Sequence, residues 1–317
     1  MPATALIAVD WGTTSARAYR LDARGDVLAQ RSVPLGIKHV RDGRFEPALA
    51  KLLGDWIDDT APRIACGMIG SRQGWVEAPY VDCPASLTAL ADRVVRAPHD
   101  LLTIVPGVAT RDAAGVPDVM RGEETQLLGA IGMSERGVLA VLPGTHSKWA
   151  RVEHGRVVDF TTFLTGELYG VLIDHSMLGR LAGHEPGRFS RDAFSRGVAR
   201  GLADGELAHD IFGARTLSLT GALESEHVAD WLSGLLIGRE VRAARAWGLR
   251  AGVEPATVRI IGTDTLVDRY ELALADAGIV AERGHADAAA RGVADAAAHG
   301  LWRIALHAGI VTTPVEA

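Results

Sequence analysis

Two short glycine–threonine turns stand between apolar runs of the sequence. The first, "DWGTTS", covers residues 10–15, and the second, "PGTHS", covers residues 143–147. Glycine accepts dihedral angles and close approaches that a side chain would block, so successive peptide N–H groups in such a turn can converge on one point. Converging N–H groups bind phosphate oxygens. We therefore predict that Gly12 and Gly144 mark two phosphate-binding turns that grip a nucleotide triphosphate.

The two turns match in spacing as well as in residue type. When the two glycines are aligned, the threonines and serines that follow them align as well. For either turn alone, an ordinary polar hairpin tip is the simpler interpretation, and it is the pairing that favours phosphate binding. His146 replaces the second threonine of the first turn, so it is either an imidazole donor or a plain hairpin-tip residue. The side chains that we expect to add donors or charge are Thr13, Thr14, Thr145, His146, Ser147 and Lys148.

Only the first turn carries a carboxylate at the end of its leading strand, because Asp10 aligns with Leu142. Mg²⁺ prefers one or two carboxylates together with water and phosphate oxygens, so Asp10 is a candidate ligand for Mg-ATP, directly or through water. An Asp that only starts the turn through an Asx hydrogen bond is the competing interpretation. A third motif, "IIGTDTL" at 260–266, joins a strand to a helix at Gly262 and Thr263, where we expect adenosine to lie.

The apolar patterns around these turns repeat one order of elements. Alternating apolar residues at 5–9, 16–21 and 27–33 predict an antiparallel meander, and the same pattern returns at 138–163. A helix with an apolar stripe follows the first meander at 46–59, and the sequence then predicts a strand, a helix and a strand. The order βββαβαβ, met twice, indicates a duplicated α/β protein.

A mostly helical stretch, at about residues 185–250, interrupts the second copy of this order. No low-complexity linker marks a domain boundary. We expect the boundary just before the second meander, where the order of elements begins again. This gives an N-terminal domain at 1–132, which holds the first phosphate turn and the loop at 70–75, and a C-terminal nucleotide-binding domain at 133–317. An alanine-rich helix from about 286 to 306 is expected near the end of the chain.

The bulk composition argues against several classes of partner. The 317 residues include 33 basic and 39 acidic ones, for a net charge of -6, and no basic stripe predicts binding to nucleic acid. No run of about 18 apolar residues predicts a membrane span, and the N-terminus lacks the pattern of a signal peptide, so we expect a cytoplasmic protein. The two cysteines, Cys66 and Cys83, fit neither a disulfide framework nor a zinc site. The composition leaves the oligomeric state open.

The motifs resemble those of the actin-like ATPase superfamily, which includes sugar kinases, heat-shock ATPases and actin. More narrowly, the chain resembles the 2-dehydro-3-deoxygalactonokinase family in the phrases "GMIGSRQGWVEAPYVDCPA" (67–85), "DVMRGEETQLLG" (118–129), "LPGTHSKW" (142–149) and "FTTFLTGELY" (160–169). The resemblance implies two actin-like ATPase domains, ribonuclease H-like in fold, around a nucleotide cleft. It also implies transfer of the γ-phosphoryl group of ATP, with Mg²⁺, to the terminal 6-hydroxyl of 2-dehydro-3-deoxy-D-galactonate in galactonate breakdown.

A 2-keto sugar acid needs a pocket with one fixed positive charge and a set of neutral donors. The loop "GSRQGW" at 70–75 supplies such groups directly after a predicted buried strand. We expect Arg72 to bind the substrate carboxylate, with Ser71, Gln73 and Trp75 along the carbon chain. A solvated surface arginine is the alternative to this role for Arg72.

Phosphoryl transfer to an alcohol also needs a carboxylate within hydrogen-bond reach of the attacking hydroxyl. Glu123 and Glu124 begin a predicted helix upstream of the second phosphate turn. Related sugar kinases usually carry Asp after a glycine at this point, and the departure leaves open which glutamate is the base, with Asp118 as a third candidate. Acidic residues in a first helical turn also interact favourably with the helix dipole without any catalysis.

Two other functions fit the same motifs. A kinase of this fold could phosphorylate another sugar acid or an anhydrosugar, and an actin-like ATPase could drive a binding cycle with no small-molecule acceptor. The loop at 70–75 and the acidic pair argue against the second alternative, because a purely conformational ATPase needs no acceptor groups.

Overall fold

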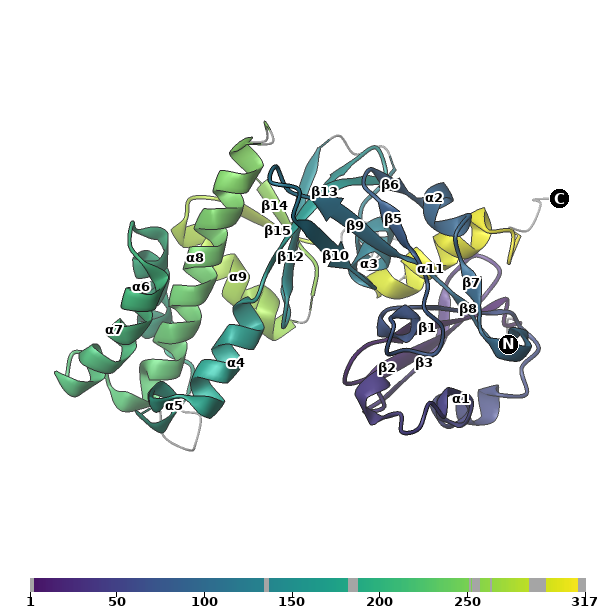
Figure 1. Cartoon of the computed structure of the whole chain (residues 1–317), viewed down its shortest axis with the longest axis horizontal. Coiled ribbons are helices and arrows are strands. Elements are labelled where there is room, and N and C mark those ends of the chain that lie inside the picture. Colours follow the sequence, from purple (N-terminus) through teal and green to yellow (C-terminus); the bar gives the residue numbers. More distant parts are fainter. Residues whose placement is uncertain are drawn as a thin grey trace. The chain divides into compact units, whose positions relative to one another are not determined.

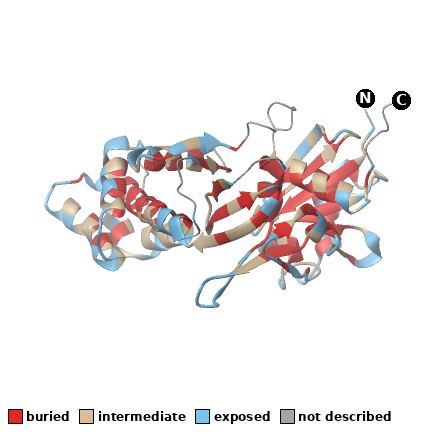
Figure 2. Cartoon of the chain, turned by 90° about the horizontal axis from the view of Figure 1, so that it is seen from above, coloured by how far each residue is buried: buried red, intermediate tan, exposed pale blue. Residues whose placement is uncertain are grey.

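The computed structural model of the chain describes residues 3–133, 137–181, 188–250, 252, 257–262, 264–284 and 295–312 (Figure 1). The chain divides into two compact units. Unit 1 comprises Met1–Val138, Ala150–Phe160 and Gly284–Ala317, and unit 2 comprises Leu139–Trp149 and Thr161–Arg283. Buried residues run along the sheet strands and the inner faces of the helices, as the red segments of Figure 2 show.

The main sheet of unit 1 begins with the predicted antiparallel meander, which is confirmed. Its strands are β1 (Leu6–Trp11), β2 (Ala16–Leu21), β3 (Val27–Val33), β4 (Arg63–Cys66), β7 (Val95–Arg96) and β8 (Thr103–Ile104). The strand order is β3-β2-β1-β4-β8-β7, with β4 and β8 parallel to β1. Every residue of β1 is buried, as expected for a central strand covered on both faces. Asp10 therefore lies near the end of a buried central strand, and Gly12 directly follows that strand.

Unit 1 includes the helices α1 (Phe45–Leu53), α2 (Leu87–Ala91), α3 (Glu123–Ala130) and α11 (Ala296–His307). α1 packs on β2 and β3, α11 packs on β1 and β4, and α2 and α3 pack against α11. The apolar stripe predicted for α1 is buried, and Ser86 caps α2, accepting a hydrogen bond of 3.1 Å from the Ala89 N–H. α3 and α11 cross at two glycines. A Cβ on Gly129 would lie 1.9 Å from the Ala296 carbonyl oxygen, and one on Gly300 would lie 2.0 Å from that of Thr125. Only glycine permits this close crossing.

A second, smaller sheet in unit 1 was not predicted. It consists of β5 (Tyr80–Asp82), β9 (Gly107–Arg111) and β10 (Pro117–Met120), in the order β10-β9-β5. Its strands are only three to five residues long, so they lack the long apolar alternation that marks a half-buried strand. β10 leads directly into Arg121 and Gly122, and thus fixes where α3 begins.

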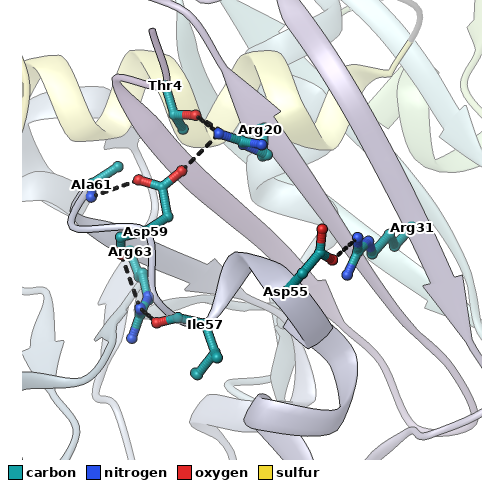
Figure 3. A network of polar contacts seen from close by, with 8 residues as sticks. All are labelled: Thr4, Arg20, Arg31, Asp55, Ile57, Asp59, Ala61 and Arg63. Atoms are coloured by element: carbon teal, nitrogen blue, oxygen red, sulfur yellow. Dashed lines mark hydrogen bonds and ion pairs between the residues drawn. The ribbon is translucent and has the colours of Figure 1, made fainter.

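Arginines on the second and third strands of the meander hold the segment that follows α1 (Figure 3). Arg20 on β2 donates to Asp59 at 2.9 Å and to Thr4, and Arg31 on β3 pairs with Asp55. The Arg31 guanidinium also lies 4.1 Å above the Trp56 ring. This polar network ties β2 and β3 to the segment that follows α1.

The third sheet repeats the order of the first. Its strands are β11 (Val138–Leu142), β12 (Ser147–Glu153), β13 (Arg156–Phe163), β14 (Thr257–Ile260), β15 (Val280–Arg283) and β6 (Ala85–Ser86). The order β13-β12-β11-β14-β15 corresponds to β3-β2-β1-β4-β8, and β14 is parallel to β11 as β4 is to β1. His154 and Gly155 both have positive φ, 49° and 68°, as a tight hairpin turn between β12 and β13 requires. The duplicated α/β order is confirmed.

Unit 2 continues after β13 with helices, and some of them cover the stretch at about 185–250 where we expect an insertion. Its helices are α4 (Thr165–His175), α5 (Met177–Leu181), α6 (Arg191–Leu202), α7 (Leu207–Leu219) and α8 (Val228–Arg250), and α9 (Asp264–Asp276) follows β14. α6 and α8 pack at glycines, since a Cβ on Gly197 would lie 2.1 Å from the Trp231 carbonyl oxygen. The α8 helix packs against α4, α6, α7 and α9, and its apolar residues belong to two clusters of the core.

The two compact units contain other residue ranges than the domains expected at 1–132 and 133–317. The compact division falls at Val138, and Ala150–Phe160 and Gly284–Ala317 belong to unit 1. The segment Gly284–Ala317 belongs to unit 1 because α11 packs against α3, α2, β1 and β4. Leu301 and Ile304 are fully buried in this packing. The predicted C-terminal helix begins at Ala296, and the part expected at 286–294 lies outside the described residues.

Candidate active site

The first glycine–threonine turn presents its peptide N–H groups on one side. Gly12 donates to the Ser15 carbonyl at 2.9 Å, which closes the turn. The carbonyl oxygens of Gly12, Thr13 and Thr14 accept hydrogen bonds from the segment Gly36–Lys38. Because a trans peptide points its C=O and N–H in opposite directions, the N–H groups that follow these carbonyls face away from that segment. Thr13 and Thr14 are exposed, so this side of the turn can meet a phosphate.

Asp10 lies at the end of β1 beside this turn and is only 8% exposed. Its Oδ2 accepts a hydrogen bond of 2.6 Å from Arg17, and its Oδ1 lies 4.0 Å from the Cys66 Sγ. Burial raises the pKa of the Asp10 carboxyl, and the Arg17 guanidinium opposes this shift. Asp295 accepts from both Arg17 and Tyr19, so it fixes the arginine on its second side. The sequence interpretation missed Arg17 and Asp295, whose separation in the chain hides the contact.

Two glycines bring the start of α3 next to Asp10. A Cβ on Gly67 would lie 2.8 Å from the Trp11 carbonyl oxygen and 3.4 Å from the Asp10 Oδ1, and one on Gly122 would lie 3.1 Å from the Gly67 Cα. Both glycines have positive φ, 91° and 108°, which disfavours any side chain there. The first glycine–threonine turn and the acidic pair are therefore neighbours in unit 1.

The two glutamates of this pair have different environments. Glu124 is fully buried, and it accepts hydrogen bonds from the Gly122 N–H at 2.6 Å and from the Thr125 hydroxyl at 2.8 Å. Burial, together with the charge of Glu123, raises the pKa of Glu124 to about 7. Glu123 is half-buried, and its Oε2 accepts from the Arg121 N–H at 3.0 Å. Asp118 lies earlier, on β10, where its carboxylate accepts from the Val119 N–H.

The loop expected to bind the sugar acid follows β4 as predicted. Arg72 and Gln73 are exposed at its tip, and the Arg72 side chain is 87% exposed with Glu77 at 3.4 Å. Trp75 is half-buried and stacks on Phe45 with ring centroids 6.1 Å apart. The Ser71 Oγ is buried without a hydrogen-bond partner. The loop therefore offers an exposed cation and one buried hydroxyl whose hydrogen bonds are unmade.

Arg121 is a second cation of this region that the sequence interpretation missed. It is 8% exposed, lies 4.4 Å above the Tyr80 ring, and donates from Nη2 to the Ala78 carbonyl at 2.8 Å. Its Nε and Nη1 are buried without partners, and Nη1 would lie 3.0 Å from a Cβ on Gly70. A guanidinium held this way keeps the loop and the start of α3 together.

In unit 2, the second glycine–threonine turn lies against the start of α4. Glu167 donates its N–H to the Thr145 carbonyl at 2.9 Å, and a Cβ on Gly166 would lie 2.4 Å from the Gly144 carbonyl oxygen. His146 is exposed and pairs with the Glu167 carboxylate. Thr145 and His146 thus lie at the surface of this turn, with the helix N-terminus beside them.

Ser147, the last residue of the turn, and Lys148, which follows it, were also predicted to be donors, but both side chains face inward. Ser147 is fully buried, and its hydroxyl lies 2.8 Å from that of Tyr270. Lys148 is 5% exposed and donates to the Thr162 hydroxyl at 2.7 Å. Alternation along β12 explains this, because residues at the start of a covered strand point into the layers on either side.

A pocket with a cavity volume of about 90 Å³ adjoins the second turn within unit 2. Its walls come from the turn, from the start of α4, and from the facing sides of α8 and α9. The lining residues are Gly144, Thr165, Gly166, Tyr169, Ser233, Leu236, Ile237, Leu266, Arg269 and Tyr270. Gly262 lies close by, since its Cβ would be 3.5 Å from the Pro143 Cδ. Thr263 lies outside the described residues.

A magnesium ion fits the donor set beside the first turn. Among the described residues, no group of three or more His, Cys, Asp or Glu side chains could hold a metal ion by itself. Asp10 keeps Oδ1 outside its ion pair with Arg17, with only the Cys66 Sγ described near it, at 4.0 Å. This suits Mg²⁺, which keeps several waters and binds through one carboxylate and substrate phosphates. No helix in the described part of the chain is long and apolar enough to cross a membrane.

The sequence matches the profile of the 2-keto-3-deoxy-galactonokinase family over residues 10–304. The chain belongs to this family. The match includes both glycine–threonine turns, the loop after β4 and the acidic start of α3. The family expected from the sequence motifs is therefore confirmed.

Similar proteins agree with this assignment. The 2-dehydro-3-deoxygalactonokinase of Escherichia coli (strain K12) is 36% identical over 273 residues, which cover 86% of this chain and 90% of that protein. A crystal structure from Sinorhizobium meliloti, described as a 2-dehydro-3-deoxygalactonokinase protein, has a TM-score of 0.82 at 35% identity, covering 95% of this chain and 98% of that one.

A more distant structure agrees in fold alone. Component A of (R)-2-hydroxyglutaryl-CoA dehydratase from Acidaminococcus fermentans has a TM-score of 0.50 at 14% identity, covering 96% of this chain and 98% of that one. The α/β class predicted from the sequence, the actin-like ATPase and sugar kinase fold, is confirmed.

Proposed function

We propose that this protein is a sugar-acid kinase that transfers the γ-phosphoryl group of ATP to the terminal 6-hydroxyl of 2-dehydro-3-deoxy-D-galactonate. The observation that carries the proposal is the family match over residues 10–304. The product is the 6-phosphate of the sugar acid, a step of galactonate catabolism, and the expected location is the cytoplasm. ATP and the sugar acid are the two small-molecule partners.

Unit 2 supplies the nucleotide site in this proposal. The pocket beside Gly144 takes the adenosine, with Gly262 at its edge, and the exposed N–H groups of Thr145 and His146 meet phosphate oxygens. The support is that the pocket, the turn and the N-terminus of α4 are contiguous, and a helix N-terminus favours negative charge. Lys148 is assigned no direct phosphate contact, because it is buried and donates to Thr162.

Unit 1 supplies the first phosphate turn and the metal ligand. Thr13 and Thr14 offer exposed hydroxyls and N–H groups to the phosphates, and Asp10 holds Mg²⁺ directly or through water. Bound Mg²⁺ would neutralise charge on the β- and γ-phosphates. Arg17 keeps the Asp10 carboxylate in place through the 2.6 Å ion pair.

Glu123 is the general base of this proposal. A base must reach the attacking hydroxyl within about 2.6–3.2 Å, and a half-buried carboxylate at a helix start can do so without rearrangement. Glu124 is fully buried with both oxygens hydrogen-bonded, so it supports the turn at Gly122 instead. Glu123 also stands directly after the glycine, where related sugar kinases carry their acidic residue.

Arg72 binds the substrate carboxylate, and Ser71, Gln73 and Trp75 complete the acceptor loop. The support is the 87% exposure of the Arg72 side chain, which leaves its guanidinium able to exchange Glu77 for a ligand carboxylate. Ser71 has a buried hydroxyl without a partner, which a ligand hydroxyl would satisfy after a small movement of the loop.

The identity of the phosphorylated oxygen tests this proposal. Purified protein is incubated with ATP, Mg²⁺ and 2-dehydro-3-deoxy-D-galactonate, and the product is examined by ³¹P and ¹³C NMR. We expect one product with carbon–phosphorus coupling at C6. Phosphorylation at another carbon would contradict the assigned acceptor. ATP hydrolysis that no sugar acid accelerates would favour a conformational ATPase instead.

A further inference from the structure

A buried carboxylate, Glu240, lies behind the pocket of unit 2. It stands on α8 and is 2% exposed. The proposed mechanism does not use it. Among its described contacts there is no cation, although ionised carboxylates inside proteins normally have one. Burial raises the pKa of Glu240 to about 7, in line with this environment.

Glu240 accepts hydrogen bonds from three different elements. The Trp149 Nε1 on β12 donates to Oε1 at 2.7 Å, and the Tyr270 hydroxyl on α9 lies 2.9 Å from both oxygens. The Thr165 hydroxyl, in the first turn of α4, donates to Oε2. Tyr270 in turn lies 2.8 Å from the hydroxyl of Ser147, the last residue of the second phosphate turn. One carboxylate thus joins the turn and the three helices around the pocket.

Two of these partners also form the pocket wall. Thr165 and Tyr270 line the cavity, whereas Glu240 and Trp149 do not. Since both hydroxyl hydrogens are directed at Glu240, the pocket receives the oxygen lone pairs of these side chains rather than their hydrogens. The carboxylate therefore determines both where these hydroxyls lie and which way they point.

We propose that Glu240 is a positioning residue of the nucleotide site, which orients Thr165 and Tyr270 in the pocket wall and, through Tyr270, holds Ser147 of the second phosphate turn. The inference rests on the proposed function only in giving this pocket to ATP. Loss of the Glu240 carboxylate should therefore change the affinity for ATP and leave the sugar-acid site unchanged.

Glutamine at position 240 separates this role from simple packing. Its side chain has the same shape, but an NH2 group replaces one oxygen. The Trp149 Nε1 can only donate, so the remaining oxygen must face it, and the NH2 then faces Thr165. The Thr165 hydroxyl must turn its hydrogen elsewhere. Glu240→Gln therefore fills the core as before but alters the pocket wall at one residue.

Asp210 provides a matched control in the same unit. Its side chain is fully buried, and it pairs with Arg200 of α6 and Arg239 of α8, none of which lines the pocket. Asp210→Asn also removes a buried carboxylate that joins helices. It should lower the thermal stability without changing the affinity for nucleotide.

The test measures binding of a non-hydrolysable ATP analogue to the full chain by calorimetry, with no sugar acid present. We expect Glu240→Gln to weaken binding about tenfold, the loss that accompanies one hydrogen bond, and Asp210→Asn to change it less than twofold. In steady-state assays, Glu240→Gln should raise KM for ATP and leave KM for the sugar acid unchanged. Equal binding by Glu240→Gln and wild type, or an equal loss in Asp210→Asn, would overturn the inference.

A second variant covers the case in which Glu240→Gln does not fold. Trp149→Phe removes one donor to Glu240 without touching the pocket wall, and it should weaken nucleotide binding about threefold. Unchanged binding in this variant would also refute the positioning role. If the wild-type chain binds no ATP analogue, the proposed nucleotide site itself is wrong, whereas binding that is insensitive to these variants refutes only the role of Glu240.

Discussion

Replacing Glu123 by glutamine removes the base assigned above while keeping its shape. The remaining amide oxygen can still accept the hydrogen bond that the Arg121 N–H makes to Oε2 at 3.0 Å, so the start of α3 should keep its structure. A positioned general base contributes about 10²- to 10⁴-fold in rate, which corresponds to about 3–5 kcal/mol in the activation free energy. We expect kcat to fall by this factor. KM for ATP should stay within about threefold of the wild type, because the pocket is lined by residues of unit 2.

Glu124→Gln is the matched control. Its carboxylate is fully buried and accepts from Gly122 and Thr125, and a glutamine can keep the first contact and donate to the Thr125 oxygen. We expect kcat to fall less than about tenfold, since the side chain has no exposed surface through which to reach a substrate hydroxyl. The assay couples ADP release to NADH oxidation at saturating ATP and sugar acid. Two fully active variants, or a larger loss in Glu124→Gln than in Glu123→Gln, would refute the assignment.

Three further predictions concern the acceptor loop, the glycine beside Asp10 and the buried acid. Arg72→Ala should raise KM for the sugar acid at least tenfold with KM for ATP unchanged, and an unchanged KM for the sugar acid in steady-state assays would exclude Arg72 as the carboxylate ligand. Gly67→Ala should lower the free energy of unfolding by about 1–3 kcal/mol, because φ is 91° and the new Cβ would lie 2.8 Å from the Trp11 carbonyl oxygen; urea titration that finds equal stability would contradict the close approach. The folded-state pKa of Glu124 is raised from 4.5 to about 7, so the folded chain holds this proton over a pH range in which the unfolded chain has lost it. The contribution of this group to stability is present below pH 4.5 and is lost as the pH rises through 7. In urea titrations, the free energy of unfolding of the wild type should therefore fall by about 3 kcal/mol relative to that of Glu124→Gln between pH 4.5 and 8. Parallel pH curves for the two proteins would contradict the raised pKa.

The duplicated architecture was predictable because each meander carries a strong local signal. The apolar pattern at 6–11, 16–21 and 27–33 marks the three strands of the first meander. The strands that follow then join the sheet through connections of the usual right-handed kind. The small sheet of β5, β9 and β10 was not predictable in this way. Its strands of three to five residues owe their pairing to tertiary context, which a local pattern does not contain.

The boundaries of the two compact units depend on packing between segments far apart in the chain. Gly129 and Gly300 allow α3 and α11 to cross closely, yet the sequence shows each of them only as one glycine among many helix-forming residues. The placement of α11 in unit 1 follows from that contact. A domain assignment from sequence order alone therefore missed it.

The candidate site was predictable where motifs are short and continuous, and hidden where they are not. The turns at Gly12 and Gly144, the loop at Arg72 and the acidic pair follow from residues a few positions apart. Glu240 lies 91 residues from Trp149, and Asp295 lies 278 residues from Arg17, so neither contact has a local signature. The inward orientation of Lys148 was likewise invisible, because it depends on which layer covers β12.

The measurement that most directly tests the central claim compares two epimeric acceptors. ADP release is followed with 2-dehydro-3-deoxy-D-galactonate and with its C4 epimer, each over a range of concentrations at saturating Mg-ATP. The proposed function predicts a kcat/KM at least tenfold higher for the galactonate-derived acid, which corresponds to about 1.4 kcal/mol in transition-state binding. A kcat/KM that favours the epimer, or ADP release that neither acid stimulates, would contradict it.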